Sequence, residues 1–389
     1  MVKVSELIEI YWGKCRRGKK CLPKERIIDE NIRHEVIEIL NEVLKRLIYQ
    51  RIWDTQWVDN TYIKIIEVAN KELKQSENKY PKELIKIVRE VLNTLLNHIN
   101  RELKAYWVVI GKEIKELIND LENGKVKVIV SKGKNTLSAY IYEEHIELKA
   151  NRIGNKNKIV AQLILKGLKG FKEVIPSVFK EAIDDEEYKE TLEPLRLGFS
   201  ITDEGIHNGK PSMSTSRIWQ IVLWCLLYPS EHHLRIDAVN INKDDVTIML
   251  HLIALEHFSN KYMAFSIIRK FSKIQFLRFM ITIVFGDGDI TFERRGNGSV
   301  RPMIRLSIGA DEFKKWEDIL NRLKELGINW KIINTKNEVQ IQIRGKNAIK
   351  LAKMMIDAIP PLITVLFNTL EVLNFDKWSK LKRIAGIEL

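Results

Sequence analysis

The sequence predicts an α+β protein in which a helical N-terminal domain precedes units built from helices and hairpins. Apolar residues recur at helical spacing over long stretches such as 83–124. Towards the C-terminus, stretches such as 289–309 alternate between apolar and polar residues with the period of a β-strand. At 389 residues the chain is long enough to bury two or three separate cores. We therefore expect three parts, which are 1–124, 125–266 and 267–389.

The first part, 1–124, is predicted to be helical. Ile and Leu recur at helical spacing in 24–48 and again in 83–124, and Gly124 suits the C-cap of the second helix. The polar stretch 74–83 contains a proline and predicts a loop. This part carries no visible catalytic pattern, so we interpret it as an accessory domain.

The middle part, 125–266, mixes both types of element. The dipeptide Asn208-Gly209 favours a tight hairpin turn. The expected elements are a hairpin of strands 125–132 and 136–150, a helix over 157–183, the hairpin around Asn208-Gly209, a tryptophan-rich helix over 217–228 and a strand pair over 234–242 and 245–255.

The last part has the clearest element order, α-β-β-α-β-β-α. Its expected elements are a helix over 267–287, a hairpin over 289–309, a helix over 311–327, a hairpin over 328–345 and a helix over 346–360. A glycine follows the second of these helices, and two prolines end the third.

The charge of the chain favours a polyanionic partner. Lys and Arg total 64 against 51 Asp and Glu, which gives a formal net charge of +13. Such an excess is typical of proteins that bind nucleic acid. The alternative is a surface rich in Lys, Glu and Ile, as in thermophile proteins, that is only incidentally basic.

Several other classes are disfavoured. The N-terminal stretch lacks the apolar segment of a signal peptide, and the most apolar run, 218–229, is too short to span a bilayer, so we expect a cytoplasmic protein without membrane contact. The spacing of a phosphate-binding loop is absent, which disfavours a nucleotide cofactor.

Cys15 and Cys21 flank a basic stretch and lack the further ligands of a zinc site, so a basic loop with two incidental thiols is expected. His251 lies in an apolar strand and is expected in the core.

Strand alternation in the last part predicts a sheet with one polar face. Ile304, Leu306 and Ile308 alternate with polar residues, so one face can pack on helices while the other presents groups that hydrogen-bond bases and phosphates. A one-sided sheet also shows water a polar face without binding anything. The candidate DNA-binding residues are Thr291, Glu293, Arg294, Arg295, Arg301, Arg305, Ser307, Lys331, Gln340, Gln342 and Arg344.

The stretch "MITIVFGDG" (280–288) resembles the nine-residue motif of LAGLIDADG homing endonucleases. The match places Asp287 at the acidic eighth position and Gly288 at the ninth. The resemblance implies that two motif helices pair at a pseudo-dyad, that their terminal carboxylates bind Mg²⁺ beside the scissile phosphates, and that two four-stranded sheets form a saddle on duplex DNA. The alternative for Asp287 is a residue that caps a turn.

The resemblance also implies a second motif upstream. "LGFSITDEG" (197–205) ends in Glu204 and Gly205, which makes Glu204 the candidate second catalytic and metal-binding carboxylate beside Asp287. The same stretch can instead be a strand that enters the Asn208-Gly209 turn. A weaker candidate is "INDLENG" (118–124), where Asn123 stands at the acidic position. The stretch 211–229 with the strands after it also resembles archaeal repeat-encoded proteins that carry one such half.

Three functional hypotheses result. The first is a sequence-selective double-stranded DNA-binding protein with a LAGLIDADG-type fold, without catalysis or with residual catalysis. The second is a Mg²⁺-dependent site-specific DNA endonuclease. The third is a structural or protein-interaction module. The DNA target and the oligomeric state stay open at this point.

Overall fold

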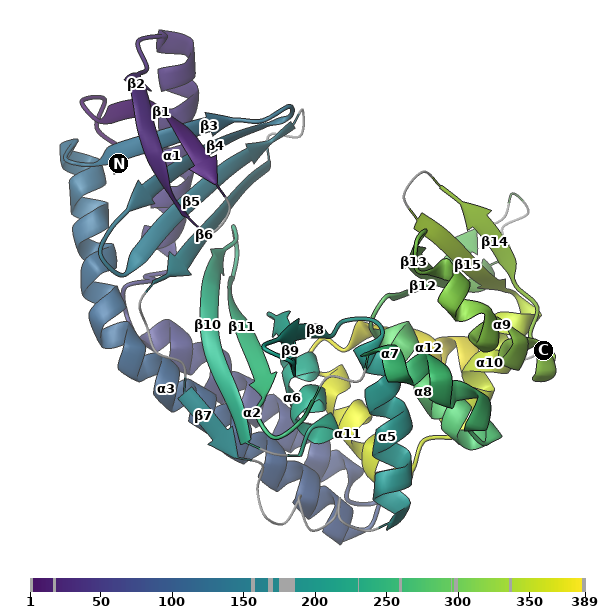
Figure 1. Ribbon diagram of the computed structural model, residues 1–389. Helices are drawn as coiled ribbons and strands as arrows, with labels where there is room; N and C mark the ends of the chain where they lie inside the picture. Colours follow the sequence, from purple (N-terminus) through teal and green to yellow (C-terminus); the bar gives the residue numbers. More distant parts are fainter. Residues whose placement is uncertain are drawn as a thin grey trace.

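A computed structural model describes residues 3–16, 19–154, 158–166, 171–174, 186–229, 231–258, 261–294, 296, 300–335 and 338–386. The chain is of mixed α and β structure. The molecule is curved, with a β-sheet standing at each end and helices along its outer side and base (Figure 1). Of the helices in these ranges, none combines the length and the apolar character needed to cross a membrane.

The N-terminal part contains a β-hairpin as well as helices. Its elements are β1 (Glu9–Arg16), β2 (Lys19–Arg26), α1 (Glu30–Tyr49), α2 (Gln56–Ser76) and α3 (Lys82–Asn123). The prediction of helix throughout is therefore wrong over β1 and β2, and the expected basic loop is a hairpin closed by a Cys15–Cys21 disulfide. The physical reason is long-range pairing, because β1 runs parallel to a strand that follows α3.

The two predicted long helices are confirmed, with ends set by local chemistry. The Asp29 carboxylate accepts hydrogen bonds from the N–H groups of Asn31 and Ile32 and so caps α1. At the end of α3, Gly124 has a φ of 72°, which glycine adopts without steric cost. The helix that begins at 24 in the prediction begins at 30 because β2 occupies the residues before it.

The strands that follow α3 are β3 (Lys127–Lys132), β4 (Thr136–Tyr142), β5 (Ile146–Ile153), β6 (Lys158–Leu165) and β7 (Phe171–Val174). The single strand predicted over 136–150 is wrong, because the chain turns after Tyr142 and β5 pairs back on β4. The helix predicted over 157–183 is also wrong over β6 and β7, since β6 pairs with a strand on each side. The rest of that prediction, 167–170 and 175–183, lies outside the described residues.

The first αββαββα unit comprises α5 (Glu186–Ser200), β8 (Gly205–His207), β9 (Lys210–Thr215), α6 (Ile218–Leu227), β10 (Glu231–Ile241), β11 (Val246–Ala254) and α7 (Lys261–Ile267). The predicted turn is confirmed, since Asn208 and Gly209 have φ values of 51° and 78°. Leu197 to Ser200 belong to the helix α5, so the alternative in which this stretch is a strand is wrong.

The second unit confirms the element order predicted for 267–360. It comprises η2 (Ile268–Lys270), α8 (Lys273–Phe285), β12 (Gly288–Arg294), β13 (Val300–Gly309), η3 (Phe313–Trp316), α9 (Glu317–Glu325), β14 (Lys331–Asn334), β15 (Glu338–Arg344) and α10 (Lys346–Asp357). The first helix begins later than expected, because Ser272 and Gln275 form a capping box at its start. Two helices without a predicted counterpart, α11 (Pro361–Glu371) and α12 (Asp376–Ala385), follow the unit.

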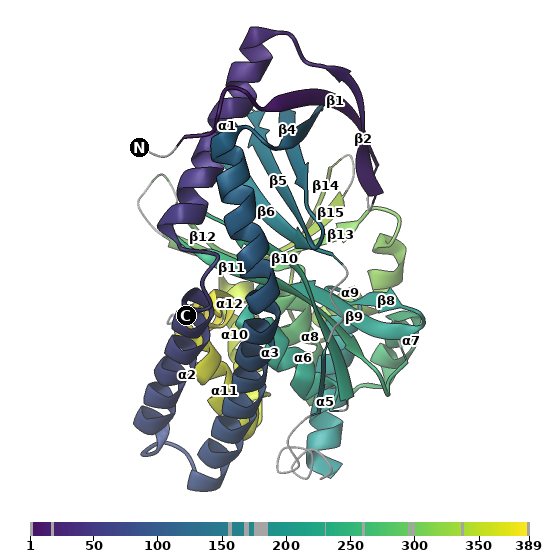
Figure 2. The ribbon, with the colours of Figure 1, turned by 90° about the vertical axis from the view of Figure 1, so that its left-hand side faces the viewer.

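The two units share one strand order. The sheet of the second unit has the order β12-β13-β15-β14, and the strands of the first unit follow the equivalent order β8-β9-β11-β10. The first sheet does not end at β10, because it continues through β6-β5-β4-β3-β1-β2. Figure 2 shows α1 and α3 on the outer side of this continuation.

The helices α5 and α8 hold the two units together through glycine contacts. A Cβ atom on Gly198 would lie 2.2 Å from the main-chain oxygen of Phe279 and 2.3 Å from Oγ1 of Thr282. One turn further along, a Cβ on Gly286 would lie 2.2 Å from Oγ1 of Thr202. The two contacts have the same separation in sequence, so the helices run side by side in one fixed register.

We expect Gly198→Ala to lower the free energy of unfolding, because overpacking costs about 1–3 kcal/mol and a Cβ 2.2 Å from a main-chain oxygen belongs at the upper end of that range. The clash is with the main chain of α8, which moves only if the helices separate, and it outweighs the ~1 kcal/mol that alanine gains in helix propensity. Urea unfolding measures the change. The control is Gly296→Ala, since nothing lies within 4 Å of a Cβ there. Equal midpoints for Gly198→Ala and wild type would contradict the tight contact.

Candidate nucleic-acid interface and paired helix ends

The β12–β15 sheet has one face without a covering helix among the described residues. Opposite residues of antiparallel strands share a face, and the register aligns Asp289, Arg305, Gln342 and Lys331 in one row across all four strands. The neighbouring rows are Thr291–Met303–Arg344, Glu293–Arg301 and Ser307–Gln340. The opposite face is buried against helices and carries Ile290, Ile304, Leu306, Ile308, Ile341 and Ile343. The predicted alternation is confirmed.

The polar side chains on this face hold one another. Arg305 forms an ion pair with Asp289 at 2.5 Å. Arg344 donates to Gln342, and the Gln342 amide donates at 3.2 Å to Gln340. Gln342 is 5% exposed, whereas the side chains of Arg305 and Arg344 are 33% and 27% exposed. The guanidinium groups therefore remain accessible on a face whose orientation is already fixed.

Two of the candidates do not belong to these rows. Arg294 is exposed at the end of β12 and alternates onto the face opposite that of Glu293. Arg295 lies outside the described residues.

The first unit carries a matching polar face that the sequence prediction missed. His251 on β11 lies opposite Ser214 and Arg235, and its Nδ1 is 2.8 Å from Ser214 Oγ. Asp237 accepts from Arg235 at 2.9 Å. The prediction of a core position for His251 is wrong, because its side chain is half-buried on the uncovered face; burial lowers the pKa of this imidazole. Period-two alternation along β11 is the signal that could have found it.

The helix register pairs Asp287 with Asp203. The sequence separation that relates Gly198 to Thr282 and Thr202 to Gly286 also relates Asp203 to Asp287. Asp203 Oδ2 accepts a hydrogen bond of 2.8 Å from the Gln220 side chain on α6. Burial raises the pKa of the Asp203 carboxyl, against the opposing effect of two nearby cations, Lys377 and Arg217.

Glu204 has a different environment from Asp203. Its side chain is 4% exposed, and the hydroxyl of Tyr228 donates to Oε2. His257 lies with its ring 5.2 Å from that of Tyr228, and burial and the Arg196 charge lower the pKa of His257 to about 4. The described contacts thus bring Asp203, rather than the predicted Glu204, to the cations at the helix ends.

The weaker upstream candidate lies elsewhere in the molecule. The Asn123 side chain donates to the Asn119 carbonyl one turn earlier in α3. The adjacent Gly124 packs on Ser5 and Leu7 of the N-terminal segment. This stretch therefore ends a helix of the N-terminal part and does not pair with α8.

Lys377 on α12 places an ammonium group at the end of α8. Its Nζ donates to the carbonyl oxygens of Phe285 at 2.6 Å and Gly286 at 2.5 Å, where a positive charge is favoured by the helix dipole. Burial lowers the pKa of Lys377 and the Arg217 charge lowers it further, while Asp203 and Asp287 raise it. The sequence prediction missed this residue, because nothing was assigned beyond 360.

Aromatic packing fixes α12 in this position. The Phe285 ring at the end of α8 lies 4.6 Å from the Phe375 ring just before α12. The Phe375 ring in turn stacks on Trp219 of α6 at 4.2 Å. Ring contacts with α6 and α8 thus fix the start of α12, and this places Lys377 against the end of α8.

A lysine ammonium group, rather than an open set of oxygen ligands, stands at the end of α8 in this arrangement. Carbonyl and carboxylate oxygens are ligands that Mg²⁺ accepts. Here, however, the ammonium group of Lys377 already takes the two carbonyl oxygens. Within the described ranges, no group of three or more His, Cys, Asp or Glu side chains is placed to hold a metal ion.

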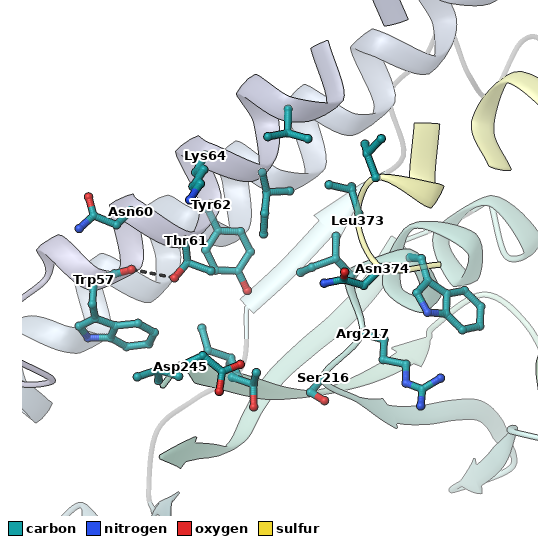
Figure 3. A pocket seen from close by; sticks show the side chains of 18 of the residues that line it. Trp57, Asn60, Thr61, Tyr62, Lys64, Ser216, Arg217, Asp245, Leu373 and Asn374 are labelled. Atoms are coloured by element: carbon teal, nitrogen blue, oxygen red, sulfur yellow. Dashed lines mark hydrogen bonds between the residues drawn. The ribbon is translucent and has the colours of Figure 1, made fainter. Parts of the chain in front are cut away.

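Asp203, Asp287 and Lys377 form what we call the helix-end cluster. A cavity of about 1060 Å³ lies beside it. It is lined by α2, the turn between β10 and β11, and the connection from α11 to α12. Figure 3 shows Tyr62 and Trp57 on the α2 side and Arg217 on the opposite side. Arg217 is also one of the charges that act on Asp203 and Lys377, so the cavity borders the helix-end cluster.

Comparison with known proteins gives a distant likeness at the level of solved structures. No protein-family description and no characterised relative matches the sequence. Among solved structures, the chain is similar to the homing endonuclease I-WcaI bound to its DNA recognition sequence, with 13% identity and a TM-score of 0.33, over 49% of this chain and 92% of that one. A likeness at this distance assigns neither a family nor a function.

We expect Asp203→Asn to become more stable relative to wild type as pH rises. The pKa of Asp203 in the folded protein is raised above its usual 3.8. Its favourable contribution to the free energy of unfolding is therefore complete below pH 3.8 and is lost as pH rises through the folded pKa. Asparagine keeps an acceptor for Gln220 and does not titrate. Urea unfolding from acid to neutral pH measures the difference, with the exposed Asp244→Asn as control. A difference that does not change with pH would contradict the raised pKa.

Proposed function

We propose that the protein binds double-stranded DNA sequence-selectively through the uncovered sheet faces of its two αββαββα units, which together form a saddle. The observation that carries this proposal is the set of polar rows across β12–β15. Arg305, Gln342 and Lys331 are neighbours in one row, and Arg344 lies in the next.

The dimensions of the rows suit a DNA groove. Neighbouring strands are about 4.8 Å apart, so a row across three strands spans about 10 Å. The major groove is about 12 Å wide and admits a β-ribbon. Arg pairs in bidentate fashion with guanine, so the accessible Arg305 and Arg344 can distinguish base pairs.

The side-chain network supports selectivity as well as affinity. Gln342 is buried and bonded on both sides, by Arg344 and to Gln340, so it orients the accessible Arg344 guanidinium before DNA arrives. A group that is held in place loses less conformational entropy on binding. The formal net charge of +13 adds attraction to phosphates without selecting a sequence.

We further propose that DNA is bound without cleavage. The support is Lys377, whose ammonium group bonds the last carbonyl oxygens of α8 and interacts electrostatically with Asp203 and Asp287, the carboxylates beside which the resemblance would put a metal ion. Lys377 supplies positive charge at the centre of the saddle, close to where the phosphates of a bound duplex would pass. Mg²⁺-dependent cleavage centred on Asp287, with Glu204 as the other carboxylate, is the competing proposal.

We expect Arg305→Ala to weaken binding of a selected duplex by about 1–3 kcal/mol and to relax selectivity at one base pair. The target is first selected from a randomised duplex library and affinities are then measured by fluorescence anisotropy. The single variant also leaves the Asp289 carboxylate without its cation, and this carboxylate would then repel DNA phosphates. The double variant Arg305→Ala with Asp289→Asn removes that repulsion and so measures the lost Arg305–DNA contact alone. Arg269→Ala, exposed in η2, is the control. Undiminished affinity and selectivity in both Arg305 variants would contradict the proposed face.

Cleavage is tested on the same selected duplex, with Mg²⁺ or with a chelator. We expect the bound duplex to remain intact under both conditions in wild type and in Asp287→Asn, as measured by sequencing all ends. Cut ends that share one sequence and vanish with chelator and in Asp287→Asn would instead establish the endonuclease.

A further inference from the structure

The sheet of the first unit continues well beyond the four strands of the unit. β6 pairs with β10, with Gln162 opposite Asn240 and Ile164 opposite Ala238. From β6 the sheet continues through β5, β4 and β3 to β1 and β2. The second unit has no such continuation among its described strands, so the two ends of the molecule differ (Figure 1).

Among the described helices, those that cover this continuation lie on its outer face. Leu148, Ala150 and Leu163 are at most 1% exposed and belong to the core that includes α1. Figure 2, which views the molecule from this side, shows α1 and α3 nearer the viewer than β4, β5 and β6. The other face points toward the end of the molecule where β12–β15 stand (Figure 1).

This inner face carries lysines that lie over tyrosine rings. The Lys166 ammonium is 4.2 Å from the centre of the Tyr142 ring, and that of Lys149 is 5.6 Å from the Tyr140 ring. The other pairs are Lys20 over Tyr142 and Lys127 over Tyr11. Water requires only that an uncovered face be polar. Lysines held on rings by cation–π contacts are in addition positioned and charged.

Acidic groups on the face do not cancel these lysines. Glu147 lies 3.3 Å from Lys166 and is the partner of that lysine. Glu9 accepts a hydrogen bond from the Tyr11 hydroxyl at 3.1 Å. The Glu143 carboxylate also interacts with the Lys20 charge. Among these described residues, four lysines thus stand against three carboxylates, which leaves the face positive.

The face is continuous with that of the first unit. Thr247, Asn240, Gln162, Lys149 and Tyr140 lie opposite one another in turn on β11, β10, β6, β5 and β4. Asn240 accepts a hydrogen bond of 2.9 Å from Gln162 across the junction. At about 4.8 Å per strand, this row runs about 19 Å without a break.

We propose that the inner face of β1–β6, which we call the lysine–tyrosine face, binds the phosphate backbone of the same DNA duplex where it flanks the segment held by the saddle. This inference rests on the proposed function. Duplex DNA is preferred to a single strand, because bases stack on free rings and here the ammonium groups of Lys149, Lys166 and Lys20 already lie over the tyrosines. Lysine contacts to phosphate add affinity without reading sequence.

The size of the face sets the length of flank to test. Six strands at about 4.8 Å cover about 25–30 Å, or roughly eight base pairs at 3.4 Å each. The selected duplex is therefore compared with the same duplex extended by about ten base pairs on each side, so that the added segment covers the full face.

We expect wild type to bind the extended duplex more tightly and with a steeper dependence on salt. Lys127→Ala with Lys149→Ala should lose this gain, with a salt slope lower by about 0.9 for each phosphate contact removed. Binding to the short duplex should not change. Lys115→Ala, an exposed lysine on α3, is the matched control, and circular dichroism confirms that every variant is folded.

The outcomes separate this inference from the proposed function. Binding of the short duplex with no gain from the flanks, or a gain that the double variant keeps, overturns the lysine–tyrosine face and leaves the saddle intact. A greater gain from single-stranded flanks overturns the choice of duplex. Failure to bind either duplex overturns the proposed function itself.

Discussion

The contact between α5 and α8 is the constraint on which the rest of the structure depends. Two helices approach this closely only where a side chain is missing, and Gly198 and Gly286 supply that space on opposite partners. Each glycine faces a threonine, so the register cannot slip without a clash. The end of α5 then fixes where β8 begins, and the end of α8 fixes where β12 begins. The position of each sheet follows from these two starting points.

The same register decides which charged groups meet at the helix ends. Asp203 and Asp287 are equivalent in the pairing, and Lys377 lies close enough to respond to both. An ammonium group bonded to two carbonyl oxygens satisfies the end of a buried helix and offsets the desolvated carboxylate of Asp203. A lysine supplied by α12 thus stabilises the junction of two units to which α12 does not belong.

Both sheets are polar on one face because that face has no covering helix among the described residues and meets water. The polar side chains on the two faces are of different kinds. In the second unit, Arg305 and Arg344 are bound to neighbours that orient them. In the continuation of the first sheet, lysines lie on tyrosine rings, which position charge without offering a fixed pattern of donors. The chemistry of one face suits selection of a sequence and that of the other suits attraction to phosphate.

The sequence by itself determined the elements whose signals are local. Periodicity gave α3 and the αββαββα order of 267–360, Asn208-Gly209 gave its turn, and alternation gave the polar rows of β12–β15. Only the tertiary structure decided that β1, β2 and β6 are strands, since their partners are distant in sequence. It alone placed Asp203 and not Glu204 beside Lys377, because a register between helices is set by which side chains fit, and that fit is made only when the two surfaces meet.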